Sequence, residues 1–132
     1  LKDEPTVSSD PVSYQNNYRV IRYSDVLLMA AEAEAQTGGA NAINYLNQVR
    51  ERAFQNSSRN YPFNGESNLL EAIYHERRLE LAGEGHRFFD LVRTGQAASK
   101  IPGFQTGKHE LFPIPQAEID LAGGNWSQNP GY

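Results

Sequence analysis

One stretch of the chain, residues 76–93, gathers acidic, basic and histidine side chains that could do chemistry. At its start, the segment HERRL at 75–79 begins like HExxH, the zinc-binding helix of metalloproteases. That zinc site needs a second histidine one helical turn after the first, and Leu79 stands in its place. The zinc interpretation therefore fails, and the sequence predicts no metal site and no cofactor.

His86 and Asp90 are the second candidate for chemistry. They are four residues apart, so they can share one helix face, where a carboxylate could orient an imidazole acting as a general base. No motif marks a serine or cysteine nucleophile nearby, and Glu76, Glu80 and Glu84 alternate with arginines. That alternation favours ion pairing over the protonated acid that glycoside hydrolysis needs. We therefore favour a structural role for His86 and predict no catalytic residue.

Some of these charges fall inside an apolar helical stripe. On a helix beginning near Asn68, Arg77 and Glu84 occupy positions at the spacing of the core residues. A charge at such a position must be paired and hydrogen-bonded, because burying it alone costs several kcal/mol. We therefore predict a partly buried arginine–carboxylate network that locks helices together. The apolar residues interleaved with these charges at core-like spacing are Leu79, Leu81, Phe88, Phe89, Leu91 and Val92.

The elements that position these charges are predicted to begin with a helical hairpin. Residues 1–17 are polar and hold two prolines, which predicts an irregular lead-in. Two helices should follow, one from Val20 to the glycines at 38–39 and one from Ala40 to Phe54, joined closely enough to lie antiparallel. The residues expected to point inward are Val20, Ser24, Leu27, Leu28, Ala31 and Ala35 in the first helix, and Ile43, Leu46, Val49 and Ala53 in the second.

A loop and two more helices are expected next. Residues 55–67 are rich in loop formers, and Asn68 with Glu71 forms a plausible capping box for the third helix. Glycines at 83 and 85 should end it, and a short fourth helix should run from His86 to Thr94. From Ile101 onward, the sequence predicts an irregular tail with prolines and aromatic residues. In this tail, residues 112–115 should be extended, and Pro115 should open a brief turn over 116–121.

Composition limits the possible classes of function. The chain has 132 residues, which is one domain by length, and its formal net charge is −4 with basic residues scattered or paired with acids. This excludes the basic patch of a nucleic-acid-binding protein. No apolar run approaches the ~20 residues of a membrane span, and the absence of cysteine excludes disulfides and thiolate metal sites.

Aromatic residues in the loop and tail could bind a sugar. Sugars lay their CH faces on aromatic rings, while amide and charged side chains bind their hydroxyl groups. Trp126 lies beside Asn125, and Tyr61 and Phe63 lie in a polar loop beside Asn64. The alternative is that these rings close hydrophobic gaps beneath irregular chain, as Tyr45 and Phe88 are expected to fill the core from their helices. The candidate ligand-binding residues are Trp126, Asn125, Tyr61 and Asn64.

Six segments of the chain, in a fixed order from about Tyr18 to Tyr132, carry a resemblance to a known family. It resembles the C-terminal signature of the SusD/RagB family, nutrient-binding lipoproteins on the outer surface of Bacteroidetes cells. The segments are RYSDVLLM followed by AEA at 22–33, LNQVRERA at 46–53, EAI with ERR and EL at 71–81, EGHRFFDL at 84–91, LFPIP at 111–115 and QNPGY at 128–132.

The resemblance implies a SusD-like, mainly α fold with tetratricopeptide-like helix pairs. It also implies that residues 18–132 form the C-terminal helical domain of a longer protein, of which this chain is a fragment. The charged residues at the signature positions are then expected to pair and to pin helix against helix. They are Arg22, Asp25, Glu32, Arg50, Arg52, Glu76, Arg77, Glu80, Glu84, His86, Arg87, Asp90 and Arg93.

The function that the resemblance implies is nutrient capture without chemistry. Such a protein binds oligosaccharide, or peptide in some members, at the outer membrane and passes it to a SusC-like TonB-dependent transporter. Much of the sugar site in relatives lies outside the stretch matched here.

Two other classes of function stay open. One is a tetratricopeptide-type adaptor that binds peptide, which the hairpin suggests, although no second copy occurs at a period of about 34 residues. The other is a glycan-acting enzyme built on His86 and the acidic cluster.

Overall fold

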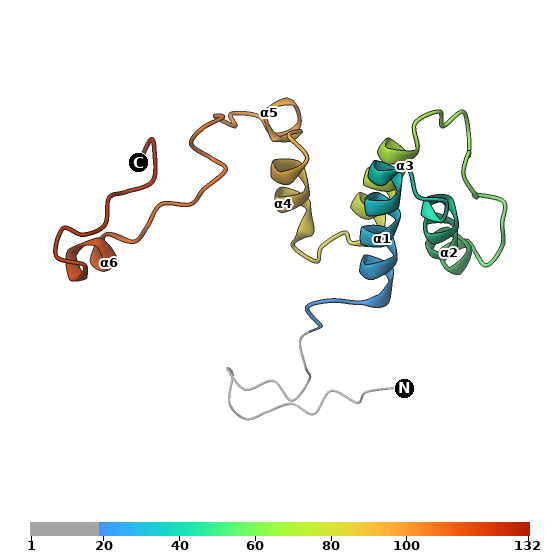
Figure 1. Cartoon of the computed structure of the whole chain (residues 1–132), viewed down its shortest axis with the longest axis horizontal. Coiled ribbons are helices and arrows are strands. Elements are labelled where there is room, and N and C mark those ends of the chain that lie inside the picture. Colours follow the sequence, from blue (N-terminus) through green and yellow to red (C-terminus); the bar gives the residue numbers. More distant parts are fainter. Residues whose placement is uncertain (1–18) are drawn as a thin grey trace, which may run out of the picture. The chain divides into compact units, whose positions relative to one another are not determined.

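The computed structural model describes residues 19–132, which fold into six helices with no strand among them (Figure 1). The mainly helical fold class is thereby confirmed, while the irregular lead-in predicted for residues 1–17 lies outside the described residues. The chain forms two compact units, an N-terminal unit ending at Glu80 and a C-terminal unit spanning Leu81–Tyr132. The helices are α1 (Tyr23–Thr37), α2 (Ala42–Phe54), α3 (Leu69–Glu80), α4 (His86–Arg93), α5 (Ala97–Lys100) and α6 (Gln116–Leu121).

The hairpin of α1 and α2 forms as predicted, with α3 packed against it (Figure 1). Gly38 ends α1 with a φ of +75°, a left-handed conformation that suits glycine. Glu34 holds the turn from both its backbone and its side chain. Its carbonyl accepts the Gly39 N–H at 2.8 Å, and its carboxylate accepts the Asn41 N–H at 3.0 Å.

The core of the N-terminal unit lies where these three helices meet. Its fully buried side chains come from all three, and the predicted inward positions of α1 and α2 supply most of them. Val20, Ile43 and Ala53 were predicted inward but are exposed, Ala53 in the last turn of α2. Val20 precedes the first turn of α1, and in α2 the inward position of the first turn is taken by Ala42 instead. The fully buried side chains are Leu28, Leu46, Val49 and Ile73.

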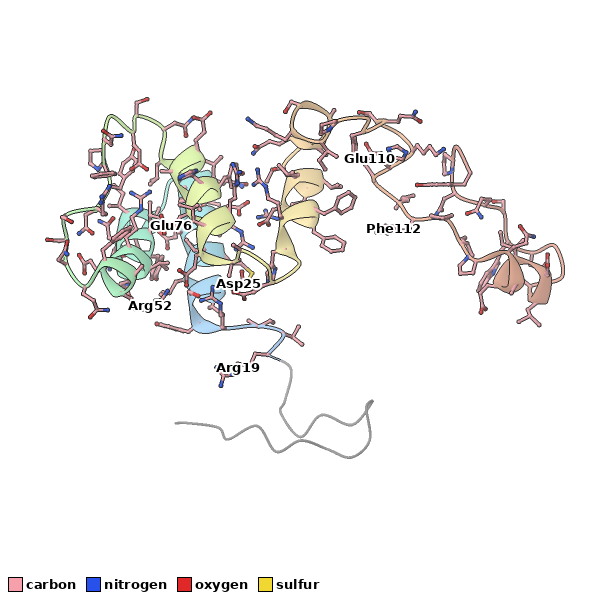
Figure 2. All side chains as sticks on the ribbon, turned by 180° about the vertical axis from the view of Figure 1, so that it is seen from behind. Arg19, Asp25, Arg52, Glu76, Glu110 and Phe112 are labelled. Carbon is pink, nitrogen blue, oxygen red and sulfur yellow. The ribbon has the colours of Figure 1, made fainter. Side chains whose placement is uncertain are left out.

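A buried ion pair joins α3 to α1. Arg77 Nη1 donates to Asp25 Oδ1 at 2.8 Å, and both residues are about 95% removed from solvent, being 5% and 4% exposed. The burial of Arg77 was predicted from its place in the apolar stripe, and it is confirmed. Figure 2 labels Asp25, which lies among the helices of this unit. Such a pair is stable only while both charges are present, because either one alone would be buried without compensation.

The third helix is shorter than predicted. Asn68 caps it, since its Oδ1 accepts the N–H groups of Leu70 and Glu71 at 3.0 and 3.2 Å. The helix then ends at Glu80, so the prediction that Glu84 continues its stripe is wrong. Gly83 has a φ of +81°, which turns the chain away before Glu84 is reached. The core position predicted for Leu79 is also wrong, because Leu79 is 58% exposed.

The C-terminal unit begins with α4, which buries Leu91 on one face. The ring of Phe88 packs against the rings of Phe89, Phe104 and Phe112, with centroids 5.6 to 6.5 Å apart. Phe89 itself is 62% exposed, so its predicted core position is wrong. The short helix α5 follows α4 and was not predicted.

The tail of this unit is held by side chains instead of a β-ladder. Pro113 and Pro115 remove two N–H groups from the extended segment, and the amide of Gln128 serves Ile114 between them. Gln128 Oε1 accepts the Ile114 N–H and Gln128 Nε2 donates to the Ile114 carbonyl, both at 2.8 Å. Asn129 Nδ2 donates to the Phe112 carbonyl at 2.6 Å. The predicted turn after Pro115 is confirmed as α6.

Replacing Arg77 with alanine is expected to lower the free energy of unfolding by more than about 2 kcal/mol, because the Asp25 carboxylate would stay buried without its guanidinium partner. Urea denaturation followed by circular dichroism measures this. Arg78→Ala is the matched control, since Arg78 is the next residue of α3 and is exposed. Equal destabilisation by the two variants would show that the buried pair contributes nothing.

Candidate functional site

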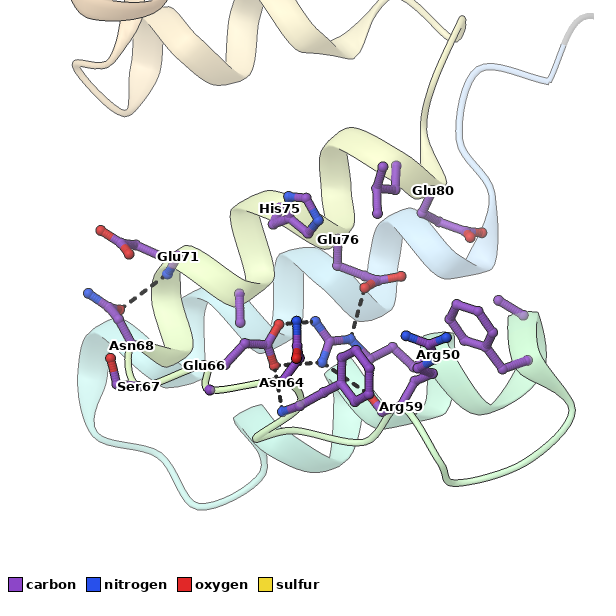
Figure 3. Close-up of a pocket in the computed structure, with 16 residues that line it drawn as sticks. Arg50, Arg59, Asn64, Glu66, Ser67, Asn68, Glu71, His75, Glu76 and Glu80 are labelled. Carbon is purple, nitrogen blue, oxygen red and sulfur yellow. Dashed lines mark hydrogen bonds and ion pairs between the residues drawn. The ribbon is translucent and has the colours of Figure 1, made fainter.

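A cavity of about 680 Å³ opens on the N-terminal unit between α2, α3 and the loop that joins them (Figure 3). Its volume lies within the ~300–1,000 Å³ typical of small-molecule sites. All of its lining residues lie between Arg50 and Glu80, so one compact unit builds the whole cavity. They are Arg50, Ala53, Phe54, Arg59, Phe63, Asn64, Gly65, Glu66, Ser67, Asn68, Glu71, Ala72, His75, Glu76, Leu79 and Glu80.

Arg50 forms the floor of the cavity and is almost fully buried. Its Nε donates to Glu76 Oε2 on α3 at 2.8 Å, while Nη1 and Nη2 donate to the two oxygens of Glu66 in the loop at 2.9 and 2.7 Å. Nη1 also donates to the backbone carbonyl of Arg59 at 3.1 Å. One guanidinium from α2 therefore binds both the loop and α3, and the bidentate pair with Glu66 fixes its orientation.

These contacts shift the ionisation of Arg50 and Glu66 in opposite directions. The hydrogen bonds from Arg50 hold the pKa of the Glu66 carboxyl below its ordinary value of 4.5, against the opposing effect of burial, and the Phe63 N–H adds to the lowering. The same hydrogen bonds raise the pKa of the Arg50 guanidinium. Both groups therefore carry their full charges near neutral pH and neutralise each other.

Glu80, the last residue of α3, is also paired with arginines. Burial alone would raise the pKa of its carboxyl, but hydrogen bonds from Arg22 and Ser24 and the charges of Arg22 and Arg52 together lower it below 4.5. Arg52 Nη2 donates to Glu80 Oε1 and Oε2 at 2.6 and 2.8 Å, and Arg22 donates to the Glu80 side chain and backbone. Glu80 thus joins α3 both to α2 and to the residue before α1.

One wall of the cavity is aromatic. The guanidinium carbon of Arg59 lies 4.4 Å from the ring centroid of Phe63 and 5.3 Å from that of Phe54. These distances are those of cation–π contacts, which hold the planar guanidinium against the rings. Phe54 and Leu79 are 48% and 58% exposed, so this wall offers apolar surface to a ligand.

The candidate ligand-binding residues fall into two separate places. Asn64 lines the cavity, while Tyr61 is half-buried, packs against the core and donates its N–H to Asn47 Oδ1 at 2.8 Å. Trp126 and Asn125 lie in the C-terminal unit, where Trp126 is 55% exposed and Asn125 Nδ2 donates to the Ala122 carbonyl at 2.8 Å. No contact tests a ligand role for any of the four, so that role stays a prediction.

The charged signature residues also divide between the units. Besides the pairs already described, Glu32 accepts a hydrogen bond from Gln36 Nε2 at 3.2 Å, and Asp90 pairs with Arg93 at 2.7 Å. His86 and Arg87 lie half-buried in the first turn of α4. Within residues 19–132, no group of three or more potential metal ligands comes together, and no helix is long and apolar enough to cross a lipid bilayer.

A second, smaller cavity of about 280 Å³ lies in the C-terminal unit. It is lined mainly by rings, with His109 facing Phe104 at a centroid distance of 5.7 Å and Lys108 Nζ lying 4.7 Å from the Tyr132 ring centroid nearby. Few polar groups line it, so it offers little to fix the hydroxyl groups of a ligand. We therefore take the larger cavity of the N-terminal unit as the candidate site.

Sequence reasoning missed several residues of that site, among them Glu66, Phe54 and Arg59. The signal in the sequence that could have indicated Phe54 and Arg59 is their spacing. Arg59 is a single cation in the loop, with one phenylalanine five residues before it and another four residues after it. Such spacing permits a cation–π sandwich, but only if the loop folds back over the end of the preceding helix.

Comparison with known proteins gives one family. The SusD family matches the chain over residues 3–132. Among curated proteins of Formosa agariphila, SusD-like protein P25 is 46% identical over 86% of this chain, and SusD-like protein P2 is 34% identical over 88%. SusD-like protein P38 is 38% identical over 69%. The aligned regions amount to 24%, 26% and 20% of these relatives, so the chain spans about a quarter of their length.

The lowered carboxyl pKa values predict acid sensitivity. Because Glu66 and Glu80 have lower pKa values when folded than when unfolded, their contribution to stability is complete above about pH 4.5. It is lost as the pH falls through their folded pKa values, since the unfolded chain takes up those protons first. The free energy of unfolding should therefore decline below about pH 4.5, as measured by urea denaturation across a pH series.

The variant Glu66→Gln should be less stable than the parent at neutral pH and should lose less stability on acidification. Glu71→Gln is the control, because Glu71 is exposed on the same unit. A Glu66→Gln variant with the parent's full acid slope would contradict this assignment.

Proposed function

The chain belongs to the SusD family, and on that premise we propose that it serves in capturing oligosaccharide at the cell surface and passing it to a SusC-like TonB-dependent transporter. The family match over residues 3–132 is the observation that carries this proposal. Proteins of the SusD family are non-catalytic binding proteins, so the proposed role is binding and delivery without cleavage. The proposed location is the outer surface of the outer membrane, as part of a lipoprotein.

The cavity of the N-terminal unit supports a binding role. It combines exposed apolar surface on Phe54 and Leu79 with amide and hydroxyl groups on Asn64 and Ser67. Sugars need both kinds of surface, one for their CH faces and one for their hydroxyl groups. We therefore propose this cavity as the sugar contact within the chain.

Trp126 supports a second contact. Trp126 is more than half exposed, so its ring is accessible to a ligand. Asn125 is its neighbour in sequence and is also exposed. We propose Trp126 and Asn125 as a separate sugar platform in the C-terminal unit.

The hairpin of α1 and α2 favours a second candidate function. Ala31 is fully buried where the two helices approach, as in the close-packed pairs of tetratricopeptide repeats, and such pairs commonly bind peptides. The alternative is therefore an adaptor that binds an extended peptide. A test against glycans and peptides together separates the two candidates.

Isothermal titration calorimetry of the chain against panels of oligosaccharides and short peptides tests the proposal. Saturable binding of a glycan, with the glycan recovered intact, is the expected result. Phe63→Ala should weaken binding roughly five- to tenfold, because the aromatic wall is lost. Phe89→Ala is the matched control, since Phe89 is an exposed phenylalanine of the other unit that lines neither cavity.

Trp126→Ala locates the contact. If this variant weakens binding while Phe63→Ala does not, the platform of the C-terminal unit is the site and the cavity is not. Binding of peptide alone would favour the adaptor. If no glycan binds, the proposal that this chain contacts the sugar is wrong.

A further inference from the structure

Arg59 is held by its neighbours but keeps its hydrogen-bond donors unused. Phe54 and Phe63 fix its guanidinium by ring contacts, and its carbonyl is fixed by Arg50. Among residues 19–132, however, the structure shows no hydrogen-bond acceptor or carboxylate on the guanidinium of Arg59. A ring contact occupies the face of a guanidinium and leaves its N–H edges available. Arg59 is therefore oriented in advance for a planar acceptor.

The other arginines around the cavity are already neutralised. Arg50 is bound by Glu66 and Glu76, and Glu80 takes up both Arg22 and Arg52. These carboxylates and arginines balance, so they leave no strong net charge on the floor of the cavity. Arg59 lies outside this balance and is exposed to solvent.

The remaining acidic group is at a different end of the cavity. Figure 3 shows Glu71 beside Asn68 at the start of α3, while Arg59 lies at the opposite end near Arg50. Glu71 therefore does not pair with Arg59, in agreement with the absence of an ion pair between them in the described structure. The cavity has a cationic end formed by one arginine.

We propose that Arg59 binds an acidic group of the captured oligosaccharide, either a carboxylate or a sulfate ester. This inference rests on the proposed function, because it names the class of sugar that the same cavity takes. A guanidinium matches both groups through paired N–H···O bonds, which a lysine ammonium cannot form. The flanking rings lower the cost of binding, since the arginine is already ordered before the ligand arrives.

Matched pairs of ligands test the proposal by isothermal titration calorimetry. One pair is an oligogalacturonate and its fully methyl-esterified form, and the other is a sulfated galactan oligosaccharide and its desulfated form. The acidic member of at least one pair should bind roughly tenfold or more tightly than its neutral partner. The preference should also fall as salt is added, because the contact is partly exposed. The pair that shows it identifies the group as carboxylate or sulfate.

Variants of the chain assign the preference to Arg59. Arg59→Ala should abolish the difference in affinity between the acidic and the neutral member of the pair. Arg59→Lys keeps the charge without the planar fork, so it should retain only part of the preference. Arg78→Ala, which removes an exposed arginine outside the cavity, should retain all of it. Circular dichroism and urea midpoints confirm that each variant is folded.

The outcomes separate this inference from the function on which it rests. Equal binding of the acidic and neutral members, or a preference that survives Arg59→Ala, overturns the role of Arg59 and leaves sugar capture intact. Failure to bind any of the four sugars, with none bound across the wider glycan panel, overturns both.

Discussion

The N-terminal unit depends on the burial of arginines that cannot be left unpaired. Glu76 and Arg77 are adjacent on α3, so their side chains leave the helix about 100° apart. Glu76 reaches Arg50 on α2, and Arg77 reaches Asp25 on α1. A rotation of α3 in either direction would break one of these pairs and strand a buried charge. The two pairs therefore fix the rotation of α3, which hydrophobic contacts alone define less sharply.

The same constraint shapes the cavity. Arg50 binds Glu76 on α3, and it also binds Glu66 and the Arg59 carbonyl in the loop. One guanidinium therefore positions both α3 and the loop. These contacts hold the loop in position while the side chains of Phe63 and Arg59 form the wall of the cavity. The polar groups of the cavity floor are already hydrogen-bonded to one another. The groups available to a ligand are therefore those at the wall and mouth of the cavity.

The sequence predicted what depends on local spacing and missed what depends on the path of the loop. The burial of Arg77 followed from its position in a 3.6-residue stripe, and the cap at Asn68 followed from local chemistry. The partners could not be derived, because Asp25 lies 52 residues from Arg77 and many acids are available at that range. The stripe was also extended too far, to Glu84, because the pattern does not say which of several glycines ends a helix. Leu79 illustrates a different limit, since it shares the exposed face of α3 with Glu71 and His75, and its apolar type alone did not reveal that face.

The pairing that stabilises the fold also argues against acid–base chemistry in the cavity. A general acid must hold a proton near neutral pH, which requires a raised carboxyl pKa. Arg50 lowers the pKa of Glu66, and Arg22 and Arg52 lower that of Glu80, so neither carboxyl can donate a proton at neutral pH. Arg50 cannot accept one, because the same contacts raise its pKa. A cavity whose buried ionisable groups are mutually neutralised can recognise the shape and charge of a ligand while leaving its bonds intact. That is the property which the proposed role, delivery of an oligosaccharide without cleavage, requires.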